Sequence, residues 1–589
     1  MKTSFLKLFD EEVMKSQPAF YWWSAVALLL VIAYTPAVAQ EHRGYAEISQ
    51  ATIGAPRQVV LGDLPQVTAI QGALKPPEAP PMRTGLSEGQ YKALKERALQ
   101  RGGLAAPGVP EEAPPTVPGE ANTSELLTPG TSRTFFPPNT LQQSVCGFIP
   151  SDMGLAANAT FVVQVANGCI TVLSATSGAP FTGFPKSLSK FFGLPEGDTI
   201  GDPRAIYDSL ANRFIVIAED FSTTPATLAL AVSQSSNPTL DWNIYTLAMG
   251  SAGECGDFPT LGQTLNEAGD ARGAIYVGFS VFSCASGAFL DNVVFFLPKT
   301  PIYAGVGFTF FFGFNFVAGG NAVDTIQPAN VMNRTDRPRA EFMVNSFNIN
   351  FGGGQCSSGC NGLVVWAVFG GVPLSGGSPS ISGVVIPTAN NYSFPADAVQ
   401  PGCTSGSCLI DTGDTRISGG VNYSAGSISG TLNTGPGILL WEVHPTLDDA
   451  GAITTAQIRN EVCFGCGGFT GGGQAYYGTI QPDAEGNFTM VYNFSSAGTN
   501  NVFPGTAFLS RRVTQAQNTL RDSGFLLAAG RAFYQQLDRF GRNRWGDYTA
   551  TAPSGLTPPS YWFSGMFSQA ISSWGTAIGR NGYTAVTEP

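Results

Sequence analysis

Residues 476–494 read YYGTIQPDAEGNFTMVYNF: a short strand, a polar turn at 483–487 and a strongly apolar aromatic strand. Short β-type runs separated by Gly, Asn, Asp and Pro are typical of all-β domains. The same pattern recurs in six further units, and each of these opens with an aspartate: 152–172, 202–218, 257–282, 324–347, 414–432 and 547–567. A repeated unit of several strands predicts a β-propeller, in which each small sheet packs against its neighbours.

The seven units place the propeller domain at 145–589 and predict seven blades, with six or eight as alternatives. Roughly 63 residues are available for each unit, whereas compact blades need only about 40 to 50. We therefore expect long loops at 352–362 and 372–411. A right-handed β-helix is the structural rival, but its repeats are shorter and more regular.

The composition limits the function. Charged residues make up only 12% of the 589-residue chain and the net charge is −11, with no cluster of Lys and Arg, so a nucleic-acid partner is not expected. His42 and His444 are the only histidines. This scarcity excludes most histidine-based metal sites and nearly all Ser-His-Asp arrangements.

The N-terminus predicts export. Residues 20–39 form an apolar run that ends in Ala37-Val38-Ala39, the pattern of a signal-peptide cleavage site, so 1–39 is interpreted as a signal peptide. The alternative is an uncleaved anchor, because about 20 apolar residues can span a bilayer. The protein is thus expected to be secreted or at the cell surface, with membrane contact only through an uncleaved leader.

Ten cysteines follow the leader, and in an exported chain an even number argues for disulfides. Local spacing and then elimination suggest the pairs Cys356–Cys360, Cys403–Cys408, Cys463–Cys466, Cys255–Cys284 and Cys146–Cys169. The alternative is a four-thiolate zinc site made by the cysteines at 356, 360, 463 and 466.

Residues 40–144 are rich in proline and are interpreted as an extended linker. One short helix is expected at about 88–101, with Ser87 and Gln90 forming a capping box. Its apolar face is thin, so a solvated helix is favoured over one that binds a partner.

Several phrases resemble a group of secreted bacterial proteins with β-propeller-like repeats of uncharacterised function. The clearest is RWGDYTA at 544–550, and others lie at 561–563, 574–579, 201–203, 257–262, 161–167 and 483–487. The resemblance spans roughly residues 150–580. It implies a propeller and export, and it implies no particular activity.

The aspartates that open the units are the most suggestive set: Asp152, Asp202, Asp257, Asp324, Asp414 and Asp547. Equivalent positions in consecutive blades would place them around one end of the channel. Converging carboxylates would need a balancing cation. Asp202, Asp257, Asp547 and Asp152 are therefore candidate ligands of a calcium ion at the mouth of the channel. The alternative reading, which is favoured, is that each accepts backbone hydrogen bonds at a tight turn. The unit at 476–494 lacks this aspartate.

Machinery for catalysis is sparse. His444 ends an apolar strand and no GxSxG motif provides an oriented serine. The aromatic run Phe308–Phe316, FTFFFGFNF, could protrude as a binding surface, but a strand buried on both sides is favoured. We therefore expect a non-enzymatic exported protein that binds a glycan, a polymer or another protein. The alternatives are a carbohydrate-active hydrolase or lyase that uses the aspartates, and a structural component of an envelope or extracellular assembly.

Overall fold

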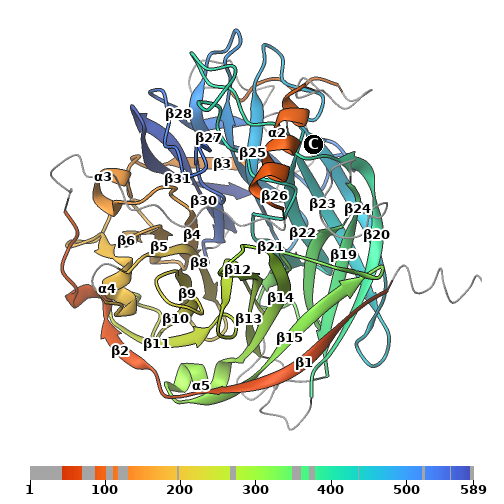
Figure 1. The fold of residues 1–589 in the computed structure, drawn as a ribbon. Helices are drawn as coiled ribbons and strands as arrows, with labels where there is room; N and C mark the ends of the chain where they lie inside the picture. Colours follow the sequence, from red (N-terminus) through yellow and green to blue (C-terminus); the bar gives the residue numbers. More distant parts are fainter. Residues whose placement is uncertain are drawn as a thin grey trace, which may run out of the picture.

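The computed structural model describes residues 43–68, 86–100, 110–116, 131–195, 198–265, 273–347, 360–370, 378–435, 437–520, 524–556 and 559–583. Strands dominate these residues, and they form antiparallel units arranged radially around one axis (Figure 1). Four of the five sheets have four or five strands, whereas β1 (Arg43–Ile53) and the parallel pairs that β17 (Gln327–Val331) makes with β12 (Glu254–Gln263) and β21 (Val421–Ser424) join three units into one sheet of 14 strands. The colours of the ribbon pass around this axis in the order of the sequence. The chain therefore has a β-rich, propeller-like fold.

Each radial unit consists of consecutive strands. In chain order these are β4 (Met153–Ala157), β5 (Phe161–Ala166), β6 (Cys169–Ser174) and β7 (Lys186–Ser187); β8 (Ile200–Asp208), β9 (Arg213–Asp220), β10 (Thr227–Ser233) and β11 (Asp241–Ala248); β12 (Glu254–Gln263), β13 (Ala274–Ser283), β14 (Phe289–Pro298) and β15 (Phe308–Ala318). They continue with β17 (Gln327–Val331), β18 (Glu341–Phe347), β19 (Cys360–Phe369) and β20 (Ser380–Tyr392); β21 (Val421–Ser424), β22 (Ser427–Thr434), β23 (Gly437–Leu447) and β24 (Ile453–Phe464); β25 (Gln474–Pro482), β26 (Phe488–Ser495), β27 (Phe503–Arg511) and β28 (Phe525–Gly530); and β29 (Ala550–Pro553), β30 (Ser560–Ala570) and β31 (Ser573–Tyr583). Short α3 (Gln143–Cys146), α4 (Leu188–Phe192), α5 (Lys299–Ala304) and strand β16 (Asn321–Ala322) lie between them.

The first strand of each unit lies next to the axis. These strands contact one another in the cyclic order β4, β8, β12, β17, β21, β25, β29 and back to β4. Residues from all of these strands, or directly beside them, line a single narrow cavity of about 50 Å³. The cavity is the central channel, and it is almost completely filled by side chains.

The hydrophobic core is divided among the contacts between neighbouring units. Trp242 of β11, for example, packs with Phe191 of α4, and Trp366 of β19 packs with Phe316 of β15. Because both faces of each sheet are buried in this way, strands such as β10 (TLALAVS) are apolar almost without interruption. Stability therefore depends on every unit having two neighbours.

The N-terminal segment contributes strands to the sheets, which the sequence analysis did not expect. β1 (Arg43–Ile53) pairs with β15 and β20, β2 (Arg57–Val60) pairs with β11, and β3 (Thr131–Phe135) pairs with β31. The one-turn helix η2 (Leu61–Asp63) follows β2. The interpretation of 40–144 as an extended linker is therefore wrong for these parts, which cover otherwise open sheet edges. Residues 380–392, expected within a long loop, form β20.

The aromatic run of β15 has rings on both faces, as the favoured interpretation expects. Phe308 and Phe310 pack between this unit and the preceding one, whereas Phe316 packs toward the following one. Asn315 has φ of 52°, and the pairing with β1 shifts register at this point. This bulge moves Phe316 to the opposite face.

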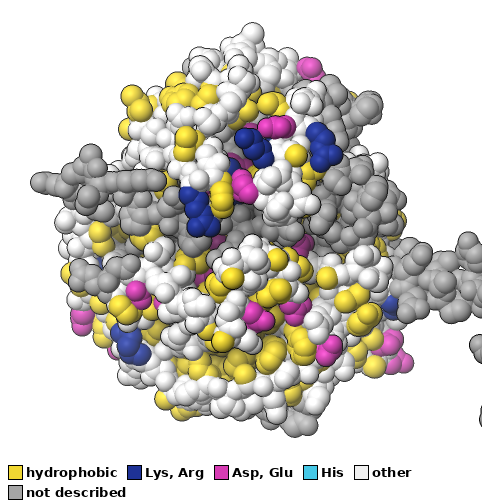
Figure 2. All heavy atoms as spheres, viewed as in Figure 1, with side chains coloured by type: hydrophobic (Ala, Val, Ile, Leu, Met, Phe, Trp, Pro, Cys, Tyr) yellow, Lys and Arg dark blue, Asp and Glu magenta, His cyan; other side chains and the backbone are white. Residues whose placement is uncertain are grey.

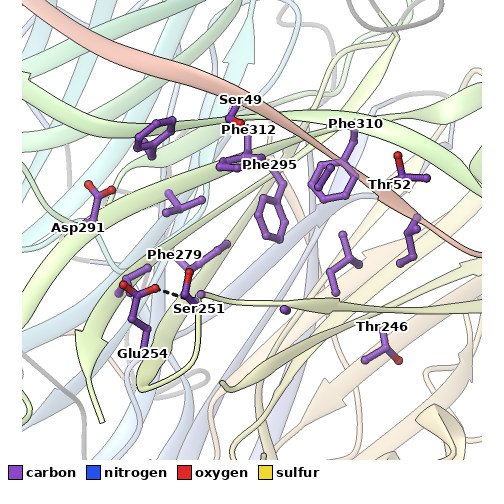
Figure 3. A pocket seen from close by; sticks show the side chains of 18 residues that line it. Ser49, Thr52, Thr246, Ser251, Glu254, Phe279, Asp291, Phe295, Phe310 and Phe312 are labelled. Atoms are coloured by element: carbon purple, nitrogen blue, oxygen red, sulfur yellow. Dashed lines mark hydrogen bonds between the residues drawn. The ribbon is translucent and has the colours of Figure 1, made fainter. Parts of the chain in front are cut away.

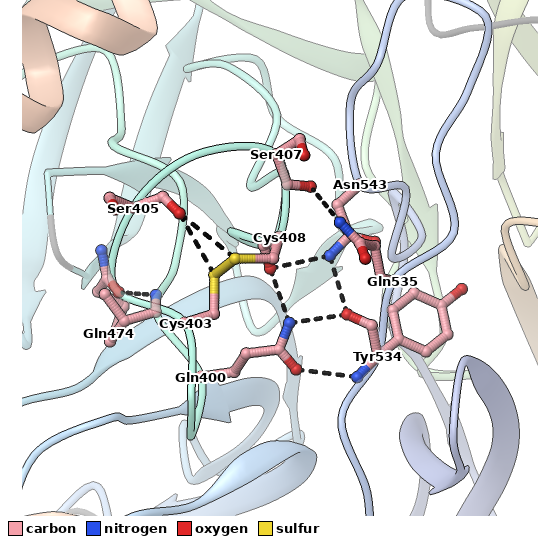
Figure 4. The surroundings of a disulfide bond; sticks show 10 residues. Gln400, Cys403, Ser405, Ser407, Cys408, Gln474, Tyr534, Gln535 and Asn543 are labelled. Atoms are coloured by element: carbon pink, nitrogen blue, oxygen red, sulfur yellow. Dashed lines mark hydrogen bonds between the residues drawn. A yellow bond between two sulfur atoms is a disulfide. The ribbon is translucent and has the colours of Figure 1, made fainter.

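Four disulfides join Cys146–Cys169, Cys255–Cys284, Cys403–Cys408 and Cys463–Cys466, and they coincide with four of the five pairs suggested by spacing and elimination. The fifth expected pair involves Cys356, which lies outside the described residues. Several disulfides point to an oxidising environment. The loop closed by Cys403–Cys408 is tied to the last unit, because Gln400 Nε2 and Asn543 Nδ2 both donate to Cys408 O and to Tyr534 O (Figure 4).

The expected leader, residues 1–39, and His42 lie outside the described residues. No helix in the described part of the chain is long and apolar enough to cross a membrane.

Candidate functional site

The aspartates that open the units lie at one end of the channel, and a residue of positive φ lies at or next to each of them. The residues concerned, in chain order, are Asp152 (23°), Asp202 (51°), Phe258 (62°), Thr325 (50°), Gly413 (70°), Tyr477 (52°) and Gly546 (141°). Asp tolerates the left-handed conformation better than most residues do, which explains part of the repeated signature. The unit without an aspartate makes the same turn at Tyr477.

Three of these carboxylates form one buried network. Asp152 Oδ1 accepts a hydrogen bond of 2.5 Å from Asp547 N, and Asp152 Oδ2 accepts one of 2.8 Å from Asn167 Nδ2. Asn167 Oδ1 in turn accepts from Asp202 N at 2.8 Å. Tyr548 OH donates to Asp202 Oδ2 at 3.0 Å, which links the last unit to the second, past the β4 unit that lies between them.

The network brings buried carboxylates together with two buried cations, because Arg204 lies over the ring of Tyr548 beside Asp202. Arg544 Nη2 lies 2.7 Å from Asp547 Oδ2 and is the nearest cation. Burial, and then the charge of Asp547, raise the pKa of Asp152 to about 7. Burial and the charges of Asp152, Asp257 and Asp547 raise the pKa of Asp202 well above its usual range. The network therefore retains protons at a pH at which exposed aspartates are ionised.

The carboxylates proposed as calcium ligands bind protein groups. Asp257 Oδ1 accepts from Phe258 N at 2.8 Å, and Asp152, Asp202 and Asp547 have the partners given above. Among the described residues, no group of three or more His, Cys, Asp or Glu side chains could hold a metal ion. Calcium at Asp152, Asp202, Asp257 and Asp547 stays a prediction without a matching geometry. The turn interpretation fits Asp257, which accepts from the next backbone N–H, whereas Asp152, Asp202 and Asp547 bind groups distant in sequence or side chains.

Helix α2 (Glu88–Gln100) covers this end of the channel (Figure 1). Tyr91 and Leu94 are buried against Phe258, Phe394 and Tyr548. The helix begins at the expected position: Gln90 Oε1 accepts from Ser87 N at 2.9 Å. The prediction of a solvated helix is wrong, because its thin apolar stripe is sufficient when buried polar contacts accompany it.

Those polar contacts centre on Lys95, which is buried. Lys95 Nζ lies 2.8 Å from Asp397 Oδ1 and 3.4 Å from Asp411 Oδ1, and Tyr91 OH donates to Asp411 Oδ1 at 2.7 Å. Burial alone would raise the pKa of Asp411, but Lys95, Arg542 and Arg544 hold it at about 2. Burial raises the pKa of Asp397 to about 6, against the lowering effect of Lys95.

The aspartate end is therefore closed. The exposed fractions of Asp152, Asp202, Asp257 and Asp547 are 0%, 7%, 4% and 3%. At these exposed fractions a polymeric substrate has no access to the four carboxylates. Lys and Arg side chains gather around the helix on this face of the molecule (Figure 2).

The opposite end of the channel is open. A depression of about 390 Å³ is formed by the hairpins at the far ends of the first strands. Its lining combines aromatic, acidic, basic and amide side chains, including Tyr207, Tyr561, Asp483, Glu485, Arg334 and Asn333. Sequence reasoning missed this site because its residues come from turns of different units, each of which looks like an ordinary hairpin.

Part of this lining is held rigidly. Asp483 Oδ1 accepts from Asn487 N at 2.8 Å and from Glu485 N at 2.9 Å, so the 483–487 segment is a hairpin turn, as expected. The ring of Tyr207 packs on Phe214 at 4.6 Å, whereas Glu485 and Arg334 are exposed. Such a site can offer a ring surface together with charged hydrogen-bonding groups.

No protein-family model matches the chain, and no curated protein matches it. Among solved structures, a protein of unknown function from Dyadobacter fermentans is similar at 12% identity, with a TM-score of 0.28, over 78% of this chain and 100% of that one. The WD40 domain of SCAP from fission yeast is similar at 8% identity, with a TM-score of 0.27, over 78% and 99%. An exo-beta-1,3-galactanase from Clostridium thermocellum is similar at 9% identity, with a TM-score of 0.27, over 67% and 68%. These are distant structural matches to β-propeller proteins.

Proposed function

We propose that this chain is an exported, seven-bladed propeller that binds a glycan in the depression at the open end of its channel. The cyclic contacts of the first strands support seven blades, and the motifs at 544–550 and 574–579 support membership of the secreted group that they resemble. The disulfides and the apolar run at 20–39 support export.

The lining of the depression is the observation that carries the choice of ligand. A sugar ring presents an apolar face, which packs on an aromatic ring such as the half-buried Tyr207, and hydroxyl groups, which bond to carboxylates, amides and guanidinium groups. The volume of about 390 Å³ lies within the usual range of ligand pockets. An extended chain could enter because the site lies at the surface.

We expect purified protein to bind one or more glycans in an array of soluble oligosaccharides, with Kd then measured by calorimetry. Replacing Glu485→Gln or Arg334→Gln should weaken that binding about tenfold, because each change removes a charged hydrogen bond of typical strength. Both side chains are exposed, so folding should be unaffected.

The matched controls are Glu96→Gln and Arg97→Gln, which are exposed on α2 at the other end of the channel. Equal effects of the control and site variants would refute a site at the depression. The hydrolase alternative predicts a different result. If the protein releases sugar products from a glycan and the Asp202→Asn variant does not, the function is catalysis and not binding alone.

A further inference from the structure

A second and larger cavity lies at the side of the molecule, away from the channel. A cleft of about 600 Å³ separates β11 from β13, β14 and β15, and β1 runs along its edge (Figure 3). Five phenylalanines line it: Phe279, Phe295, Phe310, Phe312 and Phe314.

The cleft follows from the local sequence. Alternation along β15 places Phe310, Phe312 and Phe314 on one face of the strand. β1 pairs Ser49 with Phe312 and Ala51 with Phe310, so small side chains lie beside large ones. Ser49, Ala51 and the turn at Gly250–Ser251 leave the space that a second row of large side chains would fill.

The aromatic wall is ordered by ring contacts. Phe295 packs edge-on against Phe279 at 4.9 Å and against Phe310 at 5.2 Å. Phe312 and Phe314 are only half-buried, so they present surface to the cleft. The face of a phenyl ring carries negative partial charge and attracts a cation.

The charge of the cleft has one sign. Among the described residues that line it, the charged side chains are Glu254 and Asp291, and both lie at the same end (Figure 3). Glu254 Oε2 accepts from Ser251 N at 2.7 Å, while its Oε1 has no hydrogen bond within the described part of the chain. A third carboxylate, Glu47, accepts from Asn315 Nδ2 close by. Asp and Glu side chains accompany apolar ones over this region in Figure 2.

We propose that this cleft binds a small organic cation, whose apolar or aromatic body packs on Phe295, Phe310 and Phe312 and whose charged nitrogen lies beside Glu254 and Asp291. The volume suits a ligand of drug-like size. An anion would meet two carboxylates, and a neutral apolar molecule would leave their charge unbalanced. The proposal concerns a site separate from the depression at the channel end.

The test uses three probes of similar size: benzyltrimethylammonium, benzyl alcohol and phenylacetate, titrated into the full chain by calorimetry or NMR. We expect benzyltrimethylammonium to bind at least tenfold more tightly than the neutral and anionic probes. Equal affinities for the three probes, or no binding of the cation at millimolar concentration, would overturn the proposal.

Two variants locate the site. Glu254→Gln keeps an oxygen for Ser251 N but removes the charge, and it should weaken cation binding about tenfold. Ala51→Trp should fill the cleft and abolish binding. Glu96→Gln removes the same charge far from the cleft and should change nothing. Cation binding that survives Ala51→Trp would place the ligand elsewhere and refute the assignment, whatever the result for glycans.

Discussion

Replacing Lys95→Met is expected to release α2 from the channel end without unfolding the sheets. The ammonium group of Lys95 neutralises Asp397 and Asp411 in a buried position, and removal of one partner from a buried ion pair typically costs about 3 to 5 kcal/mol. A helix of 13 residues is marginal without tertiary contacts, so this loss should exceed what holds it.

Hydrogen exchange of the helix amides measures the effect directly. We expect protection of residues 88–100 to fall by roughly a hundredfold or more, as a loss of about 3 kcal/mol implies, while the strands stay protected. Lys92→Met is the matched control, because Lys92 is exposed on the same helix. Equal exchange in the two variants would mean that the apolar contacts alone hold α2.

A rescue separates charge from packing. Asp397→Asn added to Lys95→Met removes the carboxylate whose charge Lys95 alone offsets, whereas Asp411 keeps the nearby charges of Arg542 and Arg544. The double variant should therefore recover part of the protection. Failure to recover would assign the effect to the lost aliphatic stem of Lys95.

The repeated part of the fold could be predicted from sequence because the residues of each unit show its strands and turns without reference to distant parts of the chain. Strands buried on both faces appear as apolar runs such as FVVQVA at 161–166, and the turn before them appears as an aspartate. The disulfides Cys403–Cys408 and Cys463–Cys466 followed from spacing because their partners are close along the chain, whereas the other two followed by elimination.

The N-terminal contacts could not be predicted because their partners are hundreds of residues away. β1 looks like a polar stretch, RGYAEISQATI, since one of its faces is exposed and its pairing with β15 depends on backbone groups. Helix α2 carried a usable signal: Tyr91, Leu94 and Ala98 have the spacing of a helical stripe. The burial of Lys95 carried none, because its partners Asp397 and Asp411 lie far along the chain, in the segment between β20 and β21.

The free energy of unfolding is expected to depend strongly on pH, because the aspartate network at the channel end is buried. Since the pKa of Asp152 rises from 3.8 to about 7 on folding, its deprotonation costs the folded state on the order of 4 kcal/mol. The folded chain binds more protons than the unfolded chain between these two values. The contribution of Asp152 to stability is therefore complete below about pH 4 and is lost as the pH rises through 7. Asp202 and Asp397 act in the same direction.

We expect the free energy of unfolding, measured by urea denaturation, to decrease from pH 5 to pH 8. Asp411 does not oppose this trend, because its pKa of about 2 confines its effect to lower pH. Asp152→Asn should flatten the slope while lowering stability at pH 5, since an amide cannot accept from both Asp547 N and Asn167 Nδ2. Asp449→Asn, at an exposed hairpin, should leave the slope unchanged. An Asp152→Asn slope equal to that of the unaltered chain would show that this carboxyl group titrates normally, and the buried network would then have to be balanced by a cation after all.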